Sequence, residues 1–236
     1  AVGALLVAQL TVTAAWMMAM LMFCISFLGL SRLRIERPSD AKTSAPYVQQ
    51  LIAGFHYLLG RTDLKLLLAL TALNGLLGRT VIELLPALSG QLLQGGSTEL
   101  ATLVAMAGLG SVLGGLFVSR QTADLIALFR LVCVAIGLAC LGLASLRWFS
   151  GTLGLSVWVS CLSIVATIAG TGSQTLVQLC AEGDYRGRVM SVWTMFAMGA
   201  PALGAALLGA GADRFGFSSV SMLVGGVGLG LAATCY

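Results

Sequence analysis

Charged residues are scarce in this sequence. Asp, Glu, Lys and Arg make up 9% of the 236 residues, whereas about 25% is usual in soluble globular domains. Hydrophobic residues make up 58%, and the mean hydropathy is +0.97. Because so few polar groups cannot coat a water-soluble globule, the composition places the chain in a lipid bilayer. The net charge of +4 does not indicate a nucleic-acid partner, since the basic residues lie in short segments between apolar runs.

Patterns for catalysis and for metal or cofactor binding are also missing. The six cysteines lie within or at the ends of apolar runs, with no CxxC pair and no Cys/His cluster, so we expect free thiols packed among helices. No Ser-His-Asp set is present, and the glycine-rich run 108–115 lacks the GK[ST] ending of a phosphate loop. The one histidine, His56, has no nearby partner, which favours an interfacial or packing role over a proton relay. We expect no enzyme, no cofactor and no metal site.

The first 31 residues carry no charge and are too long for one membrane helix. At about 1.5 Å per residue they would extend roughly 46 Å, against a hydrocarbon core of about 30 Å. The run AVGALLVA at 1–8 is similar to ALGAALLG at 202–209, which is followed by a turn. The same offset places the turn near Leu10 to Ala15, so we expect 1–9 to end one helix and 12–31 to form the next. The start at Ala1, without a basic n-region, indicates a chain entered mid-protein rather than a signal peptide.

A polar segment at 32–65 divides the chain. It contains an amphipathic stretch from Tyr47 to Leu59, which we expect to lie along the membrane surface. Six apolar runs follow, at 66–93, 99–118, 125–146, 152–179, 189–210 and 217–236, each long enough to span a bilayer. The sequence therefore predicts an all-α, multi-span membrane bundle of seven spans plus a remnant, organised as 1–31, 32–65 and 66–236.

The distribution of basic residues predicts the orientation. Alternate threading places two of them, Arg147 and Arg214, on one side of the membrane. The other side collects ten: Arg32, Arg34, Arg37, Lys42, Arg61, Lys65, Arg120, Arg130, Arg186 and Arg188. Since cytoplasmic loops are enriched in Lys and Arg, we expect segment 32–65 in the cytoplasm.

The run 66–93 carries Arg79 and Glu83 near its middle. A charge at the centre of a membrane helix costs about 2.5–3.5 kcal/mol, so such residues usually face a bundle interior or a water-filled cavity. At 100° per residue Asn74 points to the opposite side. The i, i+4 spacing allows Arg79 and Glu83 to pair. They are then either an internal ion-pair strut or a site of substrate contact and proton exchange. The residues that share their face are Ala72, Gly75, Pro86 and Gly90.

A second polar face runs along 152–179. Its hydroxyl groups can bond carbonyls of their own helix or join neighbouring helices, whereas glutamines are less easily satisfied in that way. A cavity-lining position is therefore favoured for Gln174. The residues of this polar face are Ser156, Ser160, Ser163, Thr167, Gly170, Thr171, Gln174 and Gln178, and from them we select Ser160, Ser163, Thr167 and Gln174 as cavity candidates beside Arg79 and Glu83.

Small residues predict close helix contacts. Gly110 with Gly114, and Ala200 with Gly204, have the small-xxx-small spacing that lets helix backbones approach. Gly199 and Pro201 lie beside the second pair. Pro201 also removes a backbone hydrogen bond, so this region is either a packing surface or a hinge.

The joint CAEGDYRGRVM between two of the runs offers Asp184, Arg186 and Arg188. These charges either only mark the cytoplasmic side of the membrane or form a cytoplasmic gate whose contacts break and re-form as the protein changes state.

The runs LLLALTALNGLLGRTVIELLPAL (66–88) and YRGRVMSVWTMFAMGAPALGAALLGAGADRFG (185–216) resemble the major facilitator superfamily, and within it the enterobactin-exporter-like branch of bacterial efflux permeases. The resemblance covers essentially the whole chain. It implies the end of the fifth membrane helix, the sixth, the central cytoplasmic loop, and helices seven to twelve. It also implies proton-driven export by alternating access, with helices seven, eight, ten and eleven lining a cavity between two six-helix halves. The joint 119–124, SRQTAD, is a poor match to the superfamily's gating motif.

We therefore expect a proton-coupled antiporter that moves a small amphipathic molecule, drug-like or siderophore-like, across the bacterial inner membrane. Its partners would be the lipid bilayer, the substrate, protons and the missing N-terminal half of the same protein. The alternative is a non-transporting membrane scaffold or assembly subunit.

Overall fold

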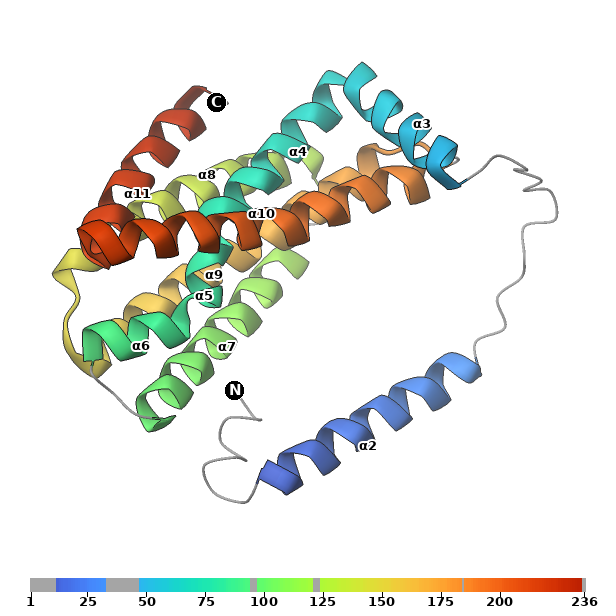
Figure 1. The fold of residues 1–236 in the computed structure, drawn as a ribbon. Coiled ribbons are helices and arrows are strands. Elements are labelled where there is room, and N and C mark those ends of the chain that lie inside the picture. The colour runs from blue at the N-terminus through green and yellow to red at the C-terminus, as the bar shows by residue number, and fades with distance from the viewer. Residues whose placement is uncertain (1–11, 33–46, 94–96, 121–123, 184, 235–236) are drawn as a thin grey trace.

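The computed structural model describes residues 12–32, 47–93, 97–120, 124–183 and 185–234, and every regular element in these ranges is a helix (Figure 1). Five helical stretches are long and apolar enough to cross a membrane: Thr62–Glu83, Thr98–Ser119, Leu125–Trp148, Gly151–Cys180 and Arg186–Phe215. Two shorter apolar helices cover Trp16–Ser31 and Phe217–Gly230. The prediction of an all-α, multi-span membrane protein is confirmed.

The helices follow the expected apolar runs with small changes at their ends. In chain order they are α2 (Val12–Ser31), α3 (Tyr47–Gly60), α4 (Thr62–Asn74), a π-helical turn (Gly75–Arg79), α5 (Thr80–Glu83), α6 (Leu85–Leu93), α7 (Ser97–Ser119), α8 (Leu125–Ala144), a 3-10 turn (Ser145–Trp148), α9 (Gly151–Cys180), α10 (Arg186–Phe215) and α11 (Phe217–Thr234). The run 66–93, expected as one helix, is thus divided between α4, the π turn, α5 and α6.

Helix α9 is the centre of the bundle and packs against α7, α8 and α4 (Figure 1). Glycines make the approach of α7 possible. A Cβ atom on Gly110 would overlap the carbonyl oxygen of Ser160, and one on Gly114 would lie 2.6 Å from the carbonyl oxygen of Ile164. The two backbones therefore meet at a distance that only glycine permits.

Helices α10 and α11 complete the bundle. Helix α11 packs on α8, where a Cβ atom on Gly225 would lie 2.6 Å from the carbonyl oxygen of Cys140. Helix α10 packs across α4 and the π turn. Aliphatic and aromatic side chains fill the core between these helices, among them Leu128, Leu143 and Trp158, all at most 3% exposed.

Helices α2 and α3 precede the bundle in the chain. In Figure 1, α2 lies apart from the bundle, and Trp16, Phe23 and other large apolar side chains along it are exposed. Helix α3 packs against α4 and the start of α10, with Leu58 buried, whereas Ile52, Phe55 and Leu59 are exposed. The expected position of α3 along the membrane surface, and the orientation of the spans, stay predictions.

Candidate functional site

The π turn at Gly75–Arg79 is where the polar residues of the first span gather. Two glycines lie within it, and glycine disfavours a regular α-helix. The Thr80 hydroxyl donates its one hydrogen mainly to the carbonyl oxygen of Gly75 at 2.9 Å and shares it with that of Pro201 at 3.4 Å. A Cβ atom on Gly75 would lie 2.8 Å from the Cβ of Ala200, so α10 approaches the turn closely. Local sequence and tertiary contact together favour the wider turn.

The π turn changes which residues share a face. In a regular α-helix, Asn74 and Arg79 would point about 140° apart. A π turn bonds residue i to i+5, which places a residue five positions further on beneath the first. Asn74, Arg79 and Glu83 consequently line the same cavity. The expectation that Asn74 points away from the charged pair is wrong, because it assumed 100° per residue throughout.

This cavity has a volume of about 320 Å³ and lies between four spans of the bundle. Helix α4 and the residues up to Glu83 contribute Thr71, Asn74, Gly75, Arg79, Ile82 and Glu83; α7 contributes Ser111; α9 contributes Ala166, Thr167, Gly170, Thr171 and Gln174; α10 contributes Trp193 and Ala197. Its wall thus combines two opposite charges, two carboxamides, four hydroxyl groups and an indole ring.

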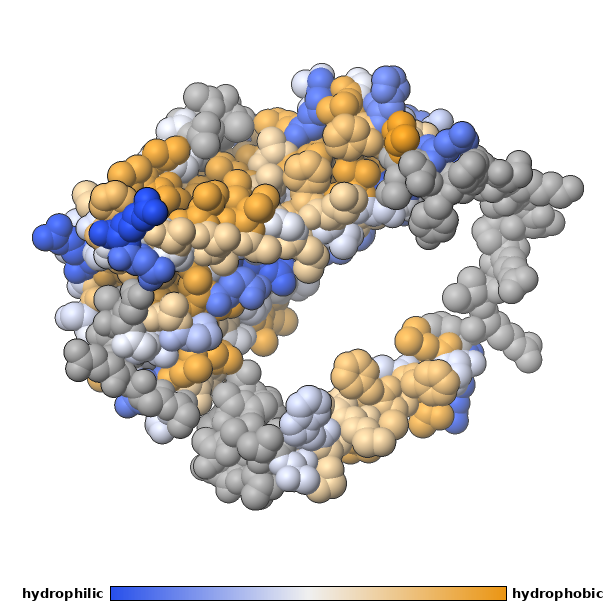
Figure 2. Space-filling view, in the orientation of Figure 1, coloured by the Kyte–Doolittle hydropathy of each residue, from blue (hydrophilic) through white to orange (hydrophobic). Residues whose placement is uncertain are grey.

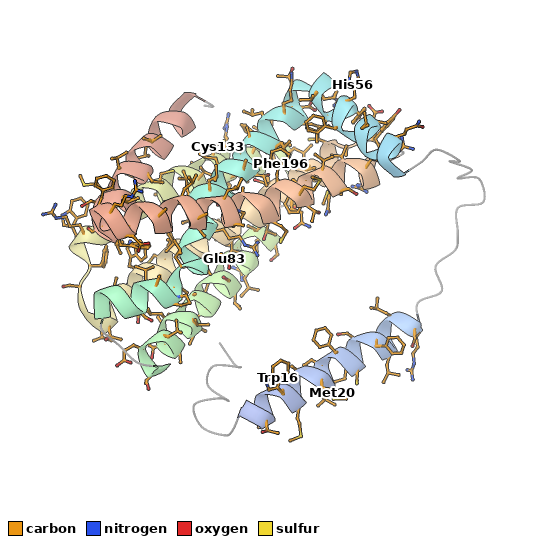
Figure 3. All side chains as sticks on the ribbon, in the orientation of Figure 1. Trp16, Met20, His56, Glu83, Cys133 and Phe196 are labelled. Carbon is orange, nitrogen blue, oxygen red and sulfur yellow. The ribbon has the colours of Figure 1, made fainter. Side chains whose placement is uncertain are left out.

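Arg79 and Glu83 are exposed, and no ion pair joins them in the part of the chain that the structure describes. Both also line a second hollow of about 250 Å³, on the side of Met198 and Pro201 of α10. Figure 2 shows a hydrophilic patch within a largely hydrophobic face, in the area where Figure 3 labels Glu83. The i, i+4 spacing therefore does not produce the pairing that it allows, and the two charges face open space.

The polar face of α9 divides into two parts. Thr167 and Gln174 line the cavity together with Arg79 and Glu83. Ser163 is fully buried, and its Cβ lies 3.0 Å from the position that a Cβ on Gly110 would take, so it faces α7. Ser160, one turn earlier, meets the same glycine with its carbonyl oxygen. The structure brings four of the six cavity candidates together and places the other two in the contact between α7 and α9.

Several polar groups of the cavity were not selected from the sequence. Trp193 donates from its indole Nε1 to the Thr71 hydroxyl at 3.1 Å, and both side chains are buried. Asn74 is 6% exposed and donates weakly from Nδ2 to the carbonyl oxygen of Ala166 at 3.4 Å. Ser111 comes from α7. Trp193 and Thr71 are 122 positions apart, and a periodicity read along one helix carries no signal for such a pair.

The small residues of α10 differ in their surroundings. A Cβ atom on Gly204 would overlap the Thr80 hydroxyl and lie 2.7 Å from the carbonyl oxygen of Leu76, so this glycine is a contact point with the π turn. Pro201 is buried beside Gly75. Gly199, in contrast, has no atom within 4 Å of an added Cβ. Close packing against the π turn thus accounts for the small residue at Gly204 and for the position of Pro201. A hinge role for Gly199 and Pro201 stays a prediction.

The α9–α10 joint is tied to α3. The rings of Tyr57 and Tyr185 stack with centroids 4.4 Å apart, and the guanidinium carbon of Arg188 lies 5.5 Å from the Tyr185 ring centre. Arg186 donates from Nε to the carbonyl oxygen of Gln178 at 2.7 Å and so closes the end of α9. The third gate candidate, Asp184, lies outside the described residues.

Ion pairs reinforce this joint. Arg61, between α3 and α4, contacts Asp63 at 2.8 Å and Glu182 at 3.2 Å. The hydrogen bond and the charge of Asp63 raise the pKa of Arg61 above its ordinary value, so the guanidinium stays charged. Neither Arg61 nor Glu182 was among the gate candidates, since a pair 121 positions apart leaves no local pattern.

These features define a class of protein: a multi-pass helical membrane protein that holds a polar, charged cavity among its spans. Within that class, the chain belongs to the transmembrane secretion effector family, of major facilitator type, whose family model matches residues 1–236. The resemblance drawn from the sequence is confirmed at superfamily level. Membership supports a transport or efflux role rather than an enzymatic one. No curated protein matches the sequence.

Proposed function

We propose that this protein exports a small amphipathic molecule by alternating access, driven by protons. It would act as an antiporter in a bacterial inner membrane, with segment 32–65 in the cytoplasm. The observation that carries the proposal is the cavity of about 320 Å³ to which Arg79 and Glu83 present charges that no ion pair neutralises within the described residues. The resemblance to the enterobactin-exporter-like branch supports a siderophore-like or drug-like substrate.

The cavity chemistry supports an amphipathic substrate. Its volume lies at the lower end of the roughly 300–1,000 Å³ typical of small-molecule sites. Ile82, Ala166 and the Trp193 ring offer apolar contact, while the carboxamides of Asn74 and Gln174 offer hydrogen bonds. A molecule with one apolar and one polar part uses both kinds of wall.

The unpaired charges support function over a structural strut. An ionised group within a span is costly, and a pair would lower that cost for both partners. Because Arg79 and Glu83 stay apart and exposed, each is free to bind a substrate group or, for Glu83, a proton. Glu83 is the one carboxylate that lines either hollow in the described residues, so we assign proton exchange to it.

The α9–α10 joint is a suitable gate in this scheme. Tyr185 stacks on Tyr57 of α3 there, and Arg188 lies against the Tyr185 ring, so a movement of α10 would change its contact with α3. Arg186 and Asp184 are the further gate candidates at the same joint.

The test is transport by the full-length protein in proteoliposomes with an imposed pH gradient, across a panel of amphipathic substrates. We expect Glu83→Gln to remove the dependence of export on the gradient while downhill exchange of substrate persists, because a glutamine cannot release a proton. Asp213→Asn is the matched control: Asp213 is exposed at the end of α10 and lines neither hollow. An unchanged pH dependence in Glu83→Gln would refute the coupling role. A wild-type protein that moves neither substrate nor protons would favour the scaffold alternative.

A further inference from the structure

A separate groove lies at the end of the bundle opposite α3. It has a volume of about 480 Å³ and runs between the 3-10 turn after α8 and the first half of α11. Arg147, Ser218 and Ser219 form its polar part; Met222, Leu223, Gly226 and Val227 form its apolar part. The α11 residues make two rows at i, i+4 spacing, so the groove follows one face of that helix for about 13 Å.

The polar part is suited to an anion. Arg147 is exposed and has no carboxylate partner in the described residues. The Ser218 hydroxyl oxygen is buried and has no hydrogen-bond partner, although it lines the groove. Helix α11 begins at Phe217, and the first N–H groups of a helix lack partners within the helix and attract negative charge. Among the described residues, no carboxylate lines the groove to oppose an anion.

The apolar part is suited to a hydrocarbon chain. Met222, Leu223 and Val227 are exposed, and an added Cβ on Gly226 would meet no atom within 4 Å, which leaves an open channel between larger side chains. Trp148, next to Arg147, is 79% exposed. Exposed tryptophan beside a basic residue at a helix end is typical of the membrane–water interface.

We propose that this groove binds one phospholipid with a net negative head group, with its phosphate at Arg147 and Ser218 and an acyl chain along Gly226. A soluble anion would leave the apolar rows of α11 uncovered, whereas a phospholipid covers both parts of the groove at once. A zwitterionic lipid carries a cation that finds no carboxylate among the described residues of the groove, so an anionic head group is preferred.

Quenching of tryptophan fluorescence by brominated lipids tests the proposal. The full chain carries Trp16→Phe, because Trp16 is the other exposed indole while Trp158 and Trp193 are buried. We expect saturable quenching of Trp148 by dibrominated phosphatidylglycerol, with an apparent affinity about fivefold above that of dibrominated phosphatidylcholine. This factor corresponds to ~1 kcal/mol for one basic residue facing anionic lipid.

Variants at two positions separate the head-group and chain contacts. Arg147→Gln should remove the preference for phosphatidylglycerol, and Arg147→Lys should retain most of it. Gly226→Leu should weaken quenching by both lipids, because leucine fills the channel. Gly115→Leu on α7 is its matched control, since an added Cβ there also meets no atom within 4 Å, and it should leave quenching unchanged.

Three results would overturn the proposal. They are equal quenching by the two lipids, a preference that persists in Arg147→Gln, and protection of Trp148 by inorganic phosphate alone. Circular dichroism of each variant checks that the helices are intact. The experiment does not depend on transport, so its outcome is independent of the proposed function.

Discussion

Replacing Gly204 with alanine will weaken the contact between α10 and the π turn. The added Cβ would overlap the Thr80 hydroxyl and lie 2.7 Å from the carbonyl oxygen of Leu76, where ordinary contact requires at least 3.4 Å. Backbone atoms cannot rotate away as a side chain does, so the two helices must separate. The Thr80 hydroxyl must also move, which weakens its bonds to Gly75 and Pro201.

The magnitude is set by two opposing effects. Adding a methyl group to a filled contact costs about 1–3 kcal/mol. A glycine-to-alanine change inside a helix gains up to about 1 kcal/mol from helix propensity. Gly199→Ala in the same helix receives this gain without the clash, because an added Cβ at Gly199 meets no atom within 4 Å. The difference between the two variants therefore isolates the clash at about 1–3 kcal/mol.

Thermal unfolding of both variants in the same detergent measures this difference. For a chain of this size about 1 kcal/mol corresponds to a shift of roughly 2–4 °C. Gly204→Ala should therefore unfold about 2–12 °C below Gly199→Ala. Equal midpoints would refute the reasoning that the α10 backbone is held against the π turn by the absence of a side chain.

Two smaller changes are expected elsewhere. Trp193→Phe removes the indole donor to Thr71, while Thr71 keeps its own bond to the carbonyl oxygen of Leu67. The free energy of unfolding should therefore fall by about 1–2 kcal/mol, and by less when the same change is made in a Thr71→Val background. Arg61→Gln removes contacts to two exposed carboxylates, so it should lower stability only slightly. Denaturation at about 1 M salt should show no difference from the wild type.

Much of the fold is predictable from the sequence because it depends on local properties. Apolar runs of membrane length define α7 to α11, and short polar joints such as Arg147 to Gly151 separate them. The break at Leu84 also has a local signal, since Pro86 lacks an N–H group and cannot bond back to the carbonyl oxygen of Ile82 as a continuous α-helix requires.

The candidate site was predictable only in part because its geometry depends on distant residues. Arg79 and Glu83 are conspicuous as charges within an apolar run. The π turn that brings Asn74 beside them is supported by Pro201, 121 positions from Thr80, and no regular period describes it. The polar face of α9 shows the same limit: Ser163 and Thr167 lie one turn apart and face Gly110 and Gly114 of α7 respectively, yet only Thr167 also lines the cavity.

The shape of the cavity depends on the number of residues between Asn74 and Arg79. The π turn there holds one residue more than an α-helical turn in the same place would hold. Deleting Leu76 would restore a regular helix in which Asn74 and Arg79 lie four positions, or about 40°, apart, so they would still share a face. A change that made the turn α-helical without removing a residue would instead place them about 140° apart. The cavity therefore depends on the match between chain length and helix type at this point.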